Sequence, residues 1–291
     1  MKFLILLLVG FGVVQASASK KIKVHGHRGA RAIRPENTLT AFSYALEVGV
    51  DVLELDLAVT KDDRIVISHD PYIDPQICLD QNGEKLPQPI MIRDLTLAQV
   101  KTYDCGTLKN PRFPNQTPSP GEKIPTLEEL FTMVSQSKLS AAKTVEFNIE
   151  TKIFPSRPEL SPPPKKFAQL VLTILKKFKM EKRTILQSFD YRTLVAMKEL
   201  SKKVRTSQLT YENLTDFVAI AKSIRADIIS PNEHWIDKDS VTKLHAAGVQ
   251  VAPWTANEKQ SWDYLIDANV DAIITDDPAA LIEYLKSRKL R

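Results

Sequence analysis

The feature that constrains the fold most is the regular alternation of short apolar strands with helical patterns. Apolar residues recur at helical spacing in most of the intervals between strands. Eight segments read as main strands, at residues 22–27, 51–59, 145–152, 184–189, 204–209, 227–230, 249–254 and 271–275. Strands that alternate with helices form a parallel sheet, and eight such units predict an α/β protein with a closed (β/α)8 TIM barrel. An open doubly wound sheet is the alternative, but no glycine-rich phosphate loop follows the first strand.

A further extended segment, residues 64–69, follows the second strand after only four residues, 60–63. A parallel strand needs a crossover of about a dozen residues or more, so this segment should pair antiparallel with the second strand. If the turn is centred on residues 61–62, His69 lies opposite Glu54. Side chains alternate along a strand, so Glu54 and Asp56 share the face opposite four apolar residues.

Residues 71–124 interrupt the alternation with Pro, Asn, Gly and Gln. An irregular span of this length is usually functional or a separate insertion, and we expect an insertion above the barrel mouth. A short helix is expected at 96–103, with Thr96 as its cap. Cys78 and Cys105 both fall in this span. Export would permit a disulfide between them, and two free thiols are the alternative.

The first 18 residues have the pattern of a signal peptide. Lys2 precedes an apolar run from Phe3 to Val14, which is too short to span a bilayer of ~30 Å. Small residues at 16–18 fit a cleavage site, so the mature chain is expected to start at Ser19 and to form one barrel domain over 19–291. This predicts an exported protein, periplasmic or secreted, without a stable membrane anchor after cleavage.

The formal net charge of the 291-residue chain is +5, and its basic residues are scattered along the sequence. Such a balance weakly favours anionic small-molecule substrates. It does not predict a nucleic-acid-binding face, and we expect no nucleic-acid partner.

Polar side chains gather where the predicted strands end. In a (β/α)8 barrel these carboxyl ends form the active-site mouth. The residues in question are His27, Arg28, Glu54, Asp56, Glu150, Lys152, Gln187 and Trp254, and the hairpin adds His69. Any one carboxylate alone could form a salt bridge, but three that converge on one mouth repel one another unless a cation is present. Oxygen ligands without cysteine suit Mg²⁺ or Ca²⁺, so Glu54, Asp56 and Glu150 are the expected metal ligands.

The two histidines fit acid–base chemistry. Cleavage of a phosphodiester requires a proton to leave the nucleophile and another to reach the leaving oxygen, and His27 and His69 can do both. Arg28 and Lys152 can neutralise a phosphate, with Gln187 beside them. Trp254 is either a platform for the substrate or a cap on the core. His25 would lie one layer deeper, and we expect it to be structural.

Several short motifs together resemble the glycerophosphodiester phosphodiesterase family. The motifs are His27-Arg28-Gly29, Pro35-Glu36-Asn37-Thr38, Glu54-x-Asp56, Thr60-Lys61-Asp62, His69-Asp70-Pro71, Glu150-Thr151-Lys152, Gln187-Ser188-Phe189 and Thr275-Asp276. The resemblance spans residues 22 to 287. It implies a (β/α)8 barrel with an insertion after the His-Asp-Pro segment, and a divalent metal.

The resemblance also implies hydrolysis of glycerophosphodiesters to sn-glycerol 3-phosphate and an alcohol. In the family, the histidines that correspond to His27 and His69 are the acid–base pair. The metal carboxylates correspond to Glu54, Asp56 and Glu150. A phospholipase-type enzyme acting on lyso- or intact phospholipids is the first alternative, and it would need an apolar mouth. A binding protein that had lost activity is the second, but no metal ligand or histidine is missing.

Overall fold

The chain is described by a computed structural model over residues 21–291. Eight strands run parallel to one another in the order β10-β9-β8-β7-β6-β2-β1-β11. Their bounds are Lys23–Gly26 (β1), Val52–Val59 (β2), Glu146–Thr151 (β6), Thr184–Ser188 (β7), Arg205–Thr210 (β8), Ile228–Pro231 (β9), Gln250–Val251 (β10) and Ala272–Thr275 (β11). The ring closes because the backbone N–H groups of Asp271 and Ile274 donate to the carbonyls of Val251 and Pro253, each at 3.0 Å. The predicted (β/α)8 barrel is confirmed.

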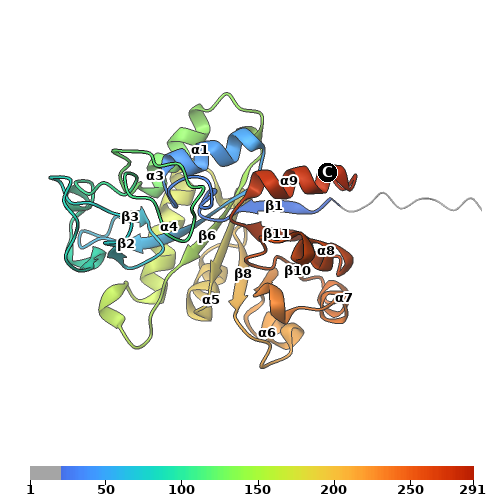
Figure 1. The fold of residues 1–291 in the computed structure, drawn as a ribbon. Helices are drawn as coiled ribbons and strands as arrows, with labels where there is room; N and C mark the ends of the chain where they lie inside the picture. Colours follow the sequence, from blue (N-terminus) through green and yellow to red (C-terminus); the bar gives the residue numbers. More distant parts are fainter. Residues whose placement is uncertain (1–20) are drawn as a thin grey trace, which may run out of the picture.

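Helices surround this ring of strands (Figure 1). Their bounds are Leu39–Val48 (α1), Leu127–Gln136 (α3), Pro164–Phe178 (α4), Tyr191–Leu200 (α5), Phe217–Ile224 (α6), Lys238–Ala246 (α7), Lys259–Asp267 (α8) and Pro278–Ser287 (α9). Helix α1 begins after Thr38, whose side chain accepts from the N–H of Ala41, and it ends at Gly49 with φ 87°. These are the start and stop signals that the sequence contains.

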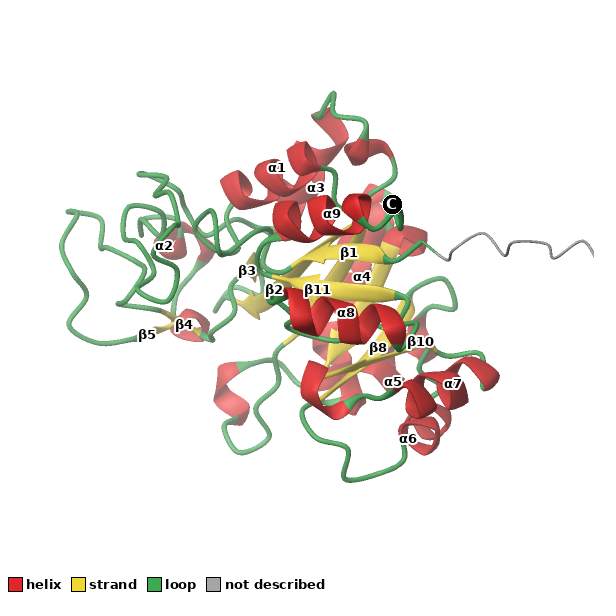
Figure 2. Cartoon of the chain, turned by 45° about the vertical axis from the view of Figure 1, so that its right-hand side comes forward, coloured by secondary structure: helices red, strands yellow, loops and turns green. Residues whose placement is uncertain are grey.

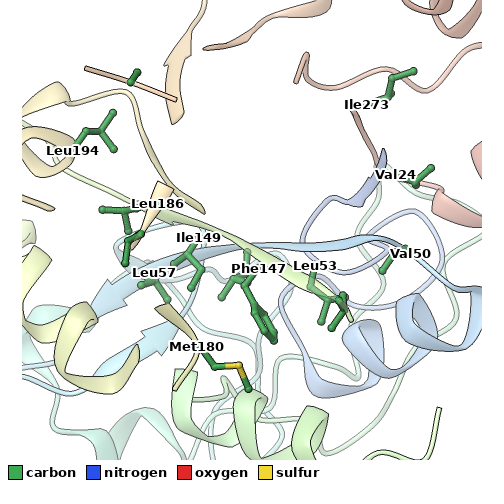
Figure 3. Packing of buried hydrophobic residues seen from close by; sticks show 14 of the residues in the cluster. Val24, Val50, Leu53, Leu57, Phe147, Ile149, Met180, Leu186, Leu194 and Ile273 are labelled. Atoms are coloured by element: carbon green, nitrogen blue, oxygen red, sulfur yellow. The ribbon is translucent and has the colours of Figure 1, made fainter. Parts of the chain in front are cut away.

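The main core lies between the strands and the surrounding helices. Strand β2 contributes Leu53, Leu55, Leu57 and Val59 to it, and all four are buried. Figure 3 shows Leu53 and Leu57 near Phe147 and Ile149 of the neighbouring strand β6. This outward apolar face leaves the alternate β2 residues, among them Glu54 and Asp56, facing the inside of the barrel.

Strand β3 (Ile65–Ile67) pairs antiparallel with β2, as the short turn predicts. The expected register was wrong by one residue. Leu57 lies opposite Ile67, and the N–H of Ser68 donates to the carbonyl of Asp56, so position 69 falls opposite 55 and not 54. The turn is therefore centred on residue 62, half a residue later than expected. This slip leaves His69 beside the same strand end.

Residues between β3 and α3 form a separate lobe beside the barrel (Figure 2). It contains the antiparallel pair Tyr72–Ile73 (β4) and Ile90–Met91 (β5), the 3₁₀ turn Ile92–Asp94 (η1) and the short helix Leu97–Val100 (α2). Its small core includes Ile73, Ile92 and Val100. Cys78 and Cys105 form a disulfide in this lobe, with an S–S distance of 2.06 Å.

Two expected elements are shorter than the sequence indicated. The helix predicted at 96–103 covers only Leu97–Val100, with Thr96 as its N-cap. The strand predicted at 249–254 is Gln250–Val251, because Pro253 has no N–H to continue the ladder. The predicted signal peptide, residues 1–18, lies outside the described residues. Within residues 21–291, no helix has both the length and the apolar character that crossing a membrane requires.

Candidate active site

The carboxyl ends of the strands surround a pocket of about 220 Å³. All nine residues assigned from the sequence line it: His27, Arg28, Glu54, Asp56, His69, Glu150, Lys152, Gln187 and Trp254. The pocket also has lining residues that sequence reasoning missed, including Arg31, Arg112 and Phe189. Strand ends that are distant in sequence therefore meet at one mouth, as the barrel geometry requires.

Three carboxylates form the centre of the pocket. Asp56 and Glu150 are direct partners on the adjacent strands β2 and β6. One oxygen from each of Glu54, Asp56 and Glu150 lies within 4.8 Å of the other two, and all three residues are buried. Burial and the neighbouring Asp56 raise the pKa of Glu54 well above its ordinary value. An all-oxygen set of this kind, strained by its own charge, fits a hard divalent cation.

Two cations already contact these carboxylates. The Lys152 Nζ lies 3.0 Å from the Asp56 Oδ1 and 2.8 Å from the Glu150 Oε1. The Arg28 Nε lies 3.4 Å from the Asp56 Oδ2, and the Arg28 backbone N–H donates to the Glu54 Oε2 at 2.8 Å. Burial alone would raise the pKa of Asp56, but Lys152, His69 and Arg28 lower it well below its ordinary value. The centre thus combines one carboxylate that is easily ionised with one that is hard to ionise.

The segment Pro35-Glu36-Asn37-Thr38 supports this centre. Glu36 accepts from the Arg28 Nη1 at 2.6 Å, which fixes the guanidinium over the pocket. The Asn37 Nδ2 donates to the Asp56 Oδ2 at 3.0 Å. The next residue, Thr38, caps helix α1. This motif is part of the family resemblance, and the structure shows what its residues do. Glu36 and Asn37 bind charged side chains of the pocket, and Thr38 starts the helix.

His27 is oriented by the carboxylate of Asp276, which was assigned no role from the sequence. The His27 Nδ1 lies 2.6 Å from the Asp276 Oδ1, and the His27 Nε2 lies 3.9 Å from the Glu54 Oε2. Asp276 also accepts from the Arg31 Nε at 2.6 Å and from the Asn257 Nδ2 at 2.8 Å. Burial and the nearby Arg31 lower the pKa of His27 to about 4, although Asp276 opposes them. His27 is therefore neutral at pH 7, with the Nε2 turned toward the carboxylates.

Asp276 could have been found from the sequence. It follows the last strand, β11, at the same mouth as the other polar strand ends, and it belongs to the quoted Thr275-Asp276 pair. Arg31 and Asn257 carried no comparable signal, because they lie in loops whose course depends on the tertiary structure.

His69 lines the same pocket and is more accessible than His27. Its Nδ1 is 3.1 Å from the Asp70 Oδ1, and its side chain is 33% exposed, against 11% for His27. It is also close enough to Asp56 and Glu150 to lower the pKa of Asp56 and to favour the charged form of Glu150. The two histidines thus face one pocket from different strand ends.

Gln187 acts within the barrel as a link between the pocket and deeper layers. Its Nε2 donates to the Glu54 Oε1 at 2.7 Å, and its Oε1 accepts from the Asn148 Nδ2 at 2.8 Å. The His25 Nδ1 lies 3.4 Å from the same Asn148 nitrogen. Burial lowers the pKa of His25 to about 3, so His25 is a neutral residue below the pocket. Gln187 therefore fixes the position of Glu54.

The other side of the mouth is aromatic. The Trp254 Nε1 donates to the Ser230 carbonyl at 2.9 Å, and its ring lies 5.5 Å from Phe189 and 6.0 Å from Tyr211, centroid to centroid. Phe189 and Tyr211 are 47% and 62% exposed. Charged groups thus line the β1, β2 and β6 side of the mouth, and aromatic rings line the β7, β8 and β10 side.

Most of the chain is similar to one family of known proteins. Residues 27–280 match the model of the glycerophosphoryl diester phosphodiesterase family. A glycerophosphodiester phosphodiesterase of Caldanaerobacter subterraneus subsp. tengcongensis is 31% identical over 270 residues, which cover 91% of this chain and 98% of that protein. A human protein named lysophospholipase D is 25% identical, over 89% of this chain and 84% of its own. A solved structure from Silicibacter pomeroyi, assigned to the same class of phosphodiesterase, superposes with a TM-score of 0.86 at 26% identity, over 94% of this chain and 95% of that one.

Proposed function

The chain belongs to the glycerophosphoryl diester phosphodiesterase family and hydrolyses glycerophosphodiesters, and from that premise we propose how its residues divide the work. The observation that carries the proposal is the convergence of two histidines and three buried carboxylates on one pocket. The substrates are small molecules in which a phosphate joins glycerol to a second alcohol. We propose sn-glycerol 3-phosphate as the product, released together with that alcohol.

Glu54, Asp56 and Glu150 are proposed to hold a divalent cation, Mg²⁺ or Ca²⁺. The support is their donor chemistry, together with the raised pKa of Glu54, which reflects burial and then the negative charge of Asp56. When bound, such a cation supplies charge stabilisation to a phosphoryl oxygen. Gln187 and the Arg28 backbone N–H hold Glu54 in place for this role. Arg28 and Lys152 already lie beside the carboxylates, so they are positioned to contact the phosphate as well.

His27 and His69 are proposed as the acid–base pair. His27 is neutral and presents the Nε2, so we assign it as the base that takes the proton of the glycerol 2-hydroxyl. That oxygen attacks phosphorus, the bond from phosphorus to the second alcohol breaks, and His69 protonates the departing oxygen. A cyclic phosphate across the glycerol 2- and 3-oxygens results. Water then attacks phosphorus, and the two histidines exchange roles as the ring opens.

Single substitutions of the two histidines test these roles. We expect His27→Ala and His69→Ala each to reduce turnover of glycerophosphocholine by about 10²-fold or more, since general acid–base catalysis typically contributes 10²–10⁴-fold. His234→Ala is the matched control, because that imidazole is 77% exposed and away from the pocket. Near wild-type turnover in either pocket variant would contradict the assignment.

A phospholipase-type activity on lyso- or intact phospholipids is the second candidate. Such an enzyme needs an apolar mouth, and the exposed rings of Phe189 and Tyr211 beside Trp254 support one. The human relative's name, lysophospholipase D, also favours it. Turnover of glycerophosphocholine should be compared with turnover of lysophosphatidylcholine below its micelle concentration. A larger kcat/KM for the acylated substrate would favour this second candidate over the first.

We further propose that the protein is exported, either to a periplasm or out of the cell. The support is the leader-like composition of residues 1–18 and the Cys78–Cys105 disulfide, a bond that persists mainly in oxidising compartments. Mass spectrometry of the protein purified from its source should find a mature chain that begins at Ser19. A chain that retains residues 1–18 and stays in the cytosolic fraction would contradict the proposal.

A further inference from the structure

One cation of the active-site pocket differs from all the others in having no carboxylate partner. Arg28 is paired with Glu36, Arg31 with Asp276, and Lys152 with both Asp56 and Glu150. Arg112 lines the same pocket from the inserted lobe, and its side chain is exposed. Within residues 21–291, its guanidinium forms no ion pair or side-chain hydrogen bond.

The loop that bears Arg112 is held firmly against the β1–α1 loop. The buried Gln116 side chain donates to the carbonyls of Arg31 and Arg34 at 2.7 and 3.1 Å, and its Oε1 accepts from the N–H of Asn110 at 3.0 Å. The Arg112 backbone N–H in turn donates to the Asn110 Oδ1 at 3.0 Å. The position of Arg112 at the mouth is thus set by contacts that extend to the loop carrying Arg28 and Arg31.

Phe113 adds a second attachment beside Arg112. Its ring centroid lies 5.0 Å from the guanidinium carbon of Arg31, the same Arg31 that binds Asp276. The inserted lobe therefore reaches the catalytic side of the barrel through consecutive residues. One of them packs on a buried arginine, and the other faces the pocket.

The balance of charges around the pocket shows why an arginine without a carboxylate partner is significant. The carboxylates that line the pocket or pair with its cations, Glu36, Glu54, Asp56, Glu150 and Asp276, outnumber Arg28, Arg31 and Lys152 by two. A divalent cation held by Glu54, Asp56 and Glu150 would offset this excess, but it would leave Arg28, Arg31 and Lys152 each paired with a carboxylate. Arg112 is the positive charge at the mouth that no carboxylate of the described chain neutralises.

We propose that Arg112 contacts the anionic oxygens of the substrate's phosphodiester, so that the inserted lobe contributes a substrate-binding residue to the barrel. This inference rests on the proposed function, because it assigns a further residue to the same substrate. The phosphate is common to all glycerophosphodiesters, so loss of the contact should weaken every substrate by a similar factor. An arginine that recognised an anion on the leaving alcohol would instead affect only substrates that carry one.

The test compares Arg112→Gln with Arg157→Gln. Arg157 is an exposed arginine outside the pocket that is paired with Glu159, so its substitution removes the same charge elsewhere. We expect Arg112→Gln to lower kcat/KM about 10-fold to 30-fold for glycerophosphocholine, glycerophosphoglycerol and glycerophosphoserine alike, as loss of a charge-assisted hydrogen bond would. It should also weaken the binding of sn-glycerol 3-phosphate, measured by calorimetry. Arg157→Gln should change neither quantity by more than about twofold.

Two results would overturn the proposal: unchanged kcat/KM and unchanged product binding in Arg112→Gln, or a loss confined to glycerophosphoserine. If the wild-type chain hydrolyses none of the three substrates, the proposed function fails, and the product-binding comparison still decides the role of Arg112.

Gln116→Leu provides an independent variant, because it frees the loop without touching Arg112. It should cause a similar loss, and Arg112→Gln combined with Gln116→Leu should be no worse than Arg112→Gln alone. Fully multiplicative losses would mean that Gln116 does not act through Arg112, and would contradict the inference.

Discussion

Replacing Glu54 by Gln should stabilise the metal-free protein and weaken its stabilisation by metal. The two carboxylates nearest to Glu54 offer oxygens within 4.8 Å, so an ionised Glu54 is repelled by each with at least about 3.5 kcal/mol at an effective dielectric constant of about 20. Hydrogen bonds from Arg28 N–H and the Gln187 Nε2 offset part of this repulsion. An amide at position 54 keeps the bond from Gln187 but loses the one from the backbone, at a cost of about 1 kcal/mol.

Protonation of Glu54 limits the cost of this repulsion to about 3.4 kcal/mol at pH 7, because the ordinary pKa of 4.5 lies about 2.5 units below that pH. After the lost hydrogen bond and the attraction of Arg28 are subtracted, the net gain expected for Glu54→Gln is about 1 to 2 kcal/mol in the free energy of unfolding at pH 7. For a chain of this size, that corresponds to a rise in Tm of about 2 to 8 °C. With the metal at about 100 times its Kd, the wild-type protein gains about 2.7 kcal/mol. The variant replaces one carboxylate ligand by a neutral amide, so it should bind the metal at least 10-fold more weakly. Its free energy of unfolding should rise by correspondingly less when metal is added. The difference in Tm between Glu54→Gln and the wild-type protein should therefore become smaller, or change sign, when metal is added.

The pH dependence of stability predicts the sign of the Glu54→Gln effect independently. The folded pKa of Glu54 is raised above its value of 4.5 in the unfolded chain, so its contribution to stability is full below that value and is lost as the pH rises through the folded pKa. The advantage of Glu54→Gln should accordingly be absent at low pH and grow toward neutrality. The assay is thermal unfolding followed by circular dichroism from pH 4 to 8, in chelator and in 10-fold steps of Mg²⁺ or Ca²⁺.

Glu146→Gln is the matched control on the opposite end of strand β6. Lys23 and Arg205 pair with Glu146 and lower its pKa despite partial burial. Its contribution to stability is present above the unfolded value of 4.5 and is lost as the pH falls, so Glu146→Gln should lower Tm at pH 7, with or without metal. The reasoning is refuted if Glu54→Gln lowers the metal-free Tm at pH 7, or if metal stabilises both proteins equally.

Three further predictions concern groups around the pocket. Asp276→Asn should lower kcat about 100-fold with a smaller change in KM, because the His27 Nδ1 loses an anionic acceptor at 2.6 Å. A rise in KM as large as the fall in kcat would indicate a role in substrate binding. Trp254→Ala should raise KM for glycerophosphocholine about 10-fold through loss of an aromatic contact at the mouth, and an unchanged KM would assign Trp254 to the core. Replacing both Cys78 and Cys105 by Ala should lower the free energy of unfolding by about 3 to 4 kcal/mol for a loop closed over 27 positions, measured in denaturant; no change would mean that the lobe is ordered without the disulfide.

The architecture could be predicted from the sequence because strand and helix patterns are local. The face of β2 that carries Glu54 and Asp56 followed from alternation alone, and the antiparallel hairpin followed from a connection too short for a crossover. The register of that hairpin was wrong by one residue, since the turn centre depends on which residues of 60–63 take the turn conformation. His69 still lies at the pocket, because a register error of one residue changes its partner on β2 but leaves it beside the same end of that strand.

Residues that act by support were harder to find. Asn148 supports Glu54 only through Gln187, by side-chain hydrogen bonds between strands that depend on the lateral order of the strands and not on any local pattern. Gln187 was assigned to the site from the sequence, but beside the phosphate and not as the support of Glu54. Arg112 lies in the irregular lobe, where the sequence predicts little beyond a short helix, and its place at the pocket follows from the contacts of Gln116 with the β1–α1 loop. Contacts of this kind link segments with no shared periodicity.

The most direct test of the central claim is the rate of glycerophosphocholine hydrolysis with and without divalent ions. The protein should be treated with chelator, dialysed, and assayed before and after the addition of Mg²⁺ or Ca²⁺, with sn-glycerol 3-phosphate measured as the product. Because Glu54, Asp56 and Glu150 are proposed to act through such an ion, we expect chelation to lower the rate by about 100-fold or more and one of the two ions to restore it. A chelated protein that forms sn-glycerol 3-phosphate at the untreated rate would contradict the account.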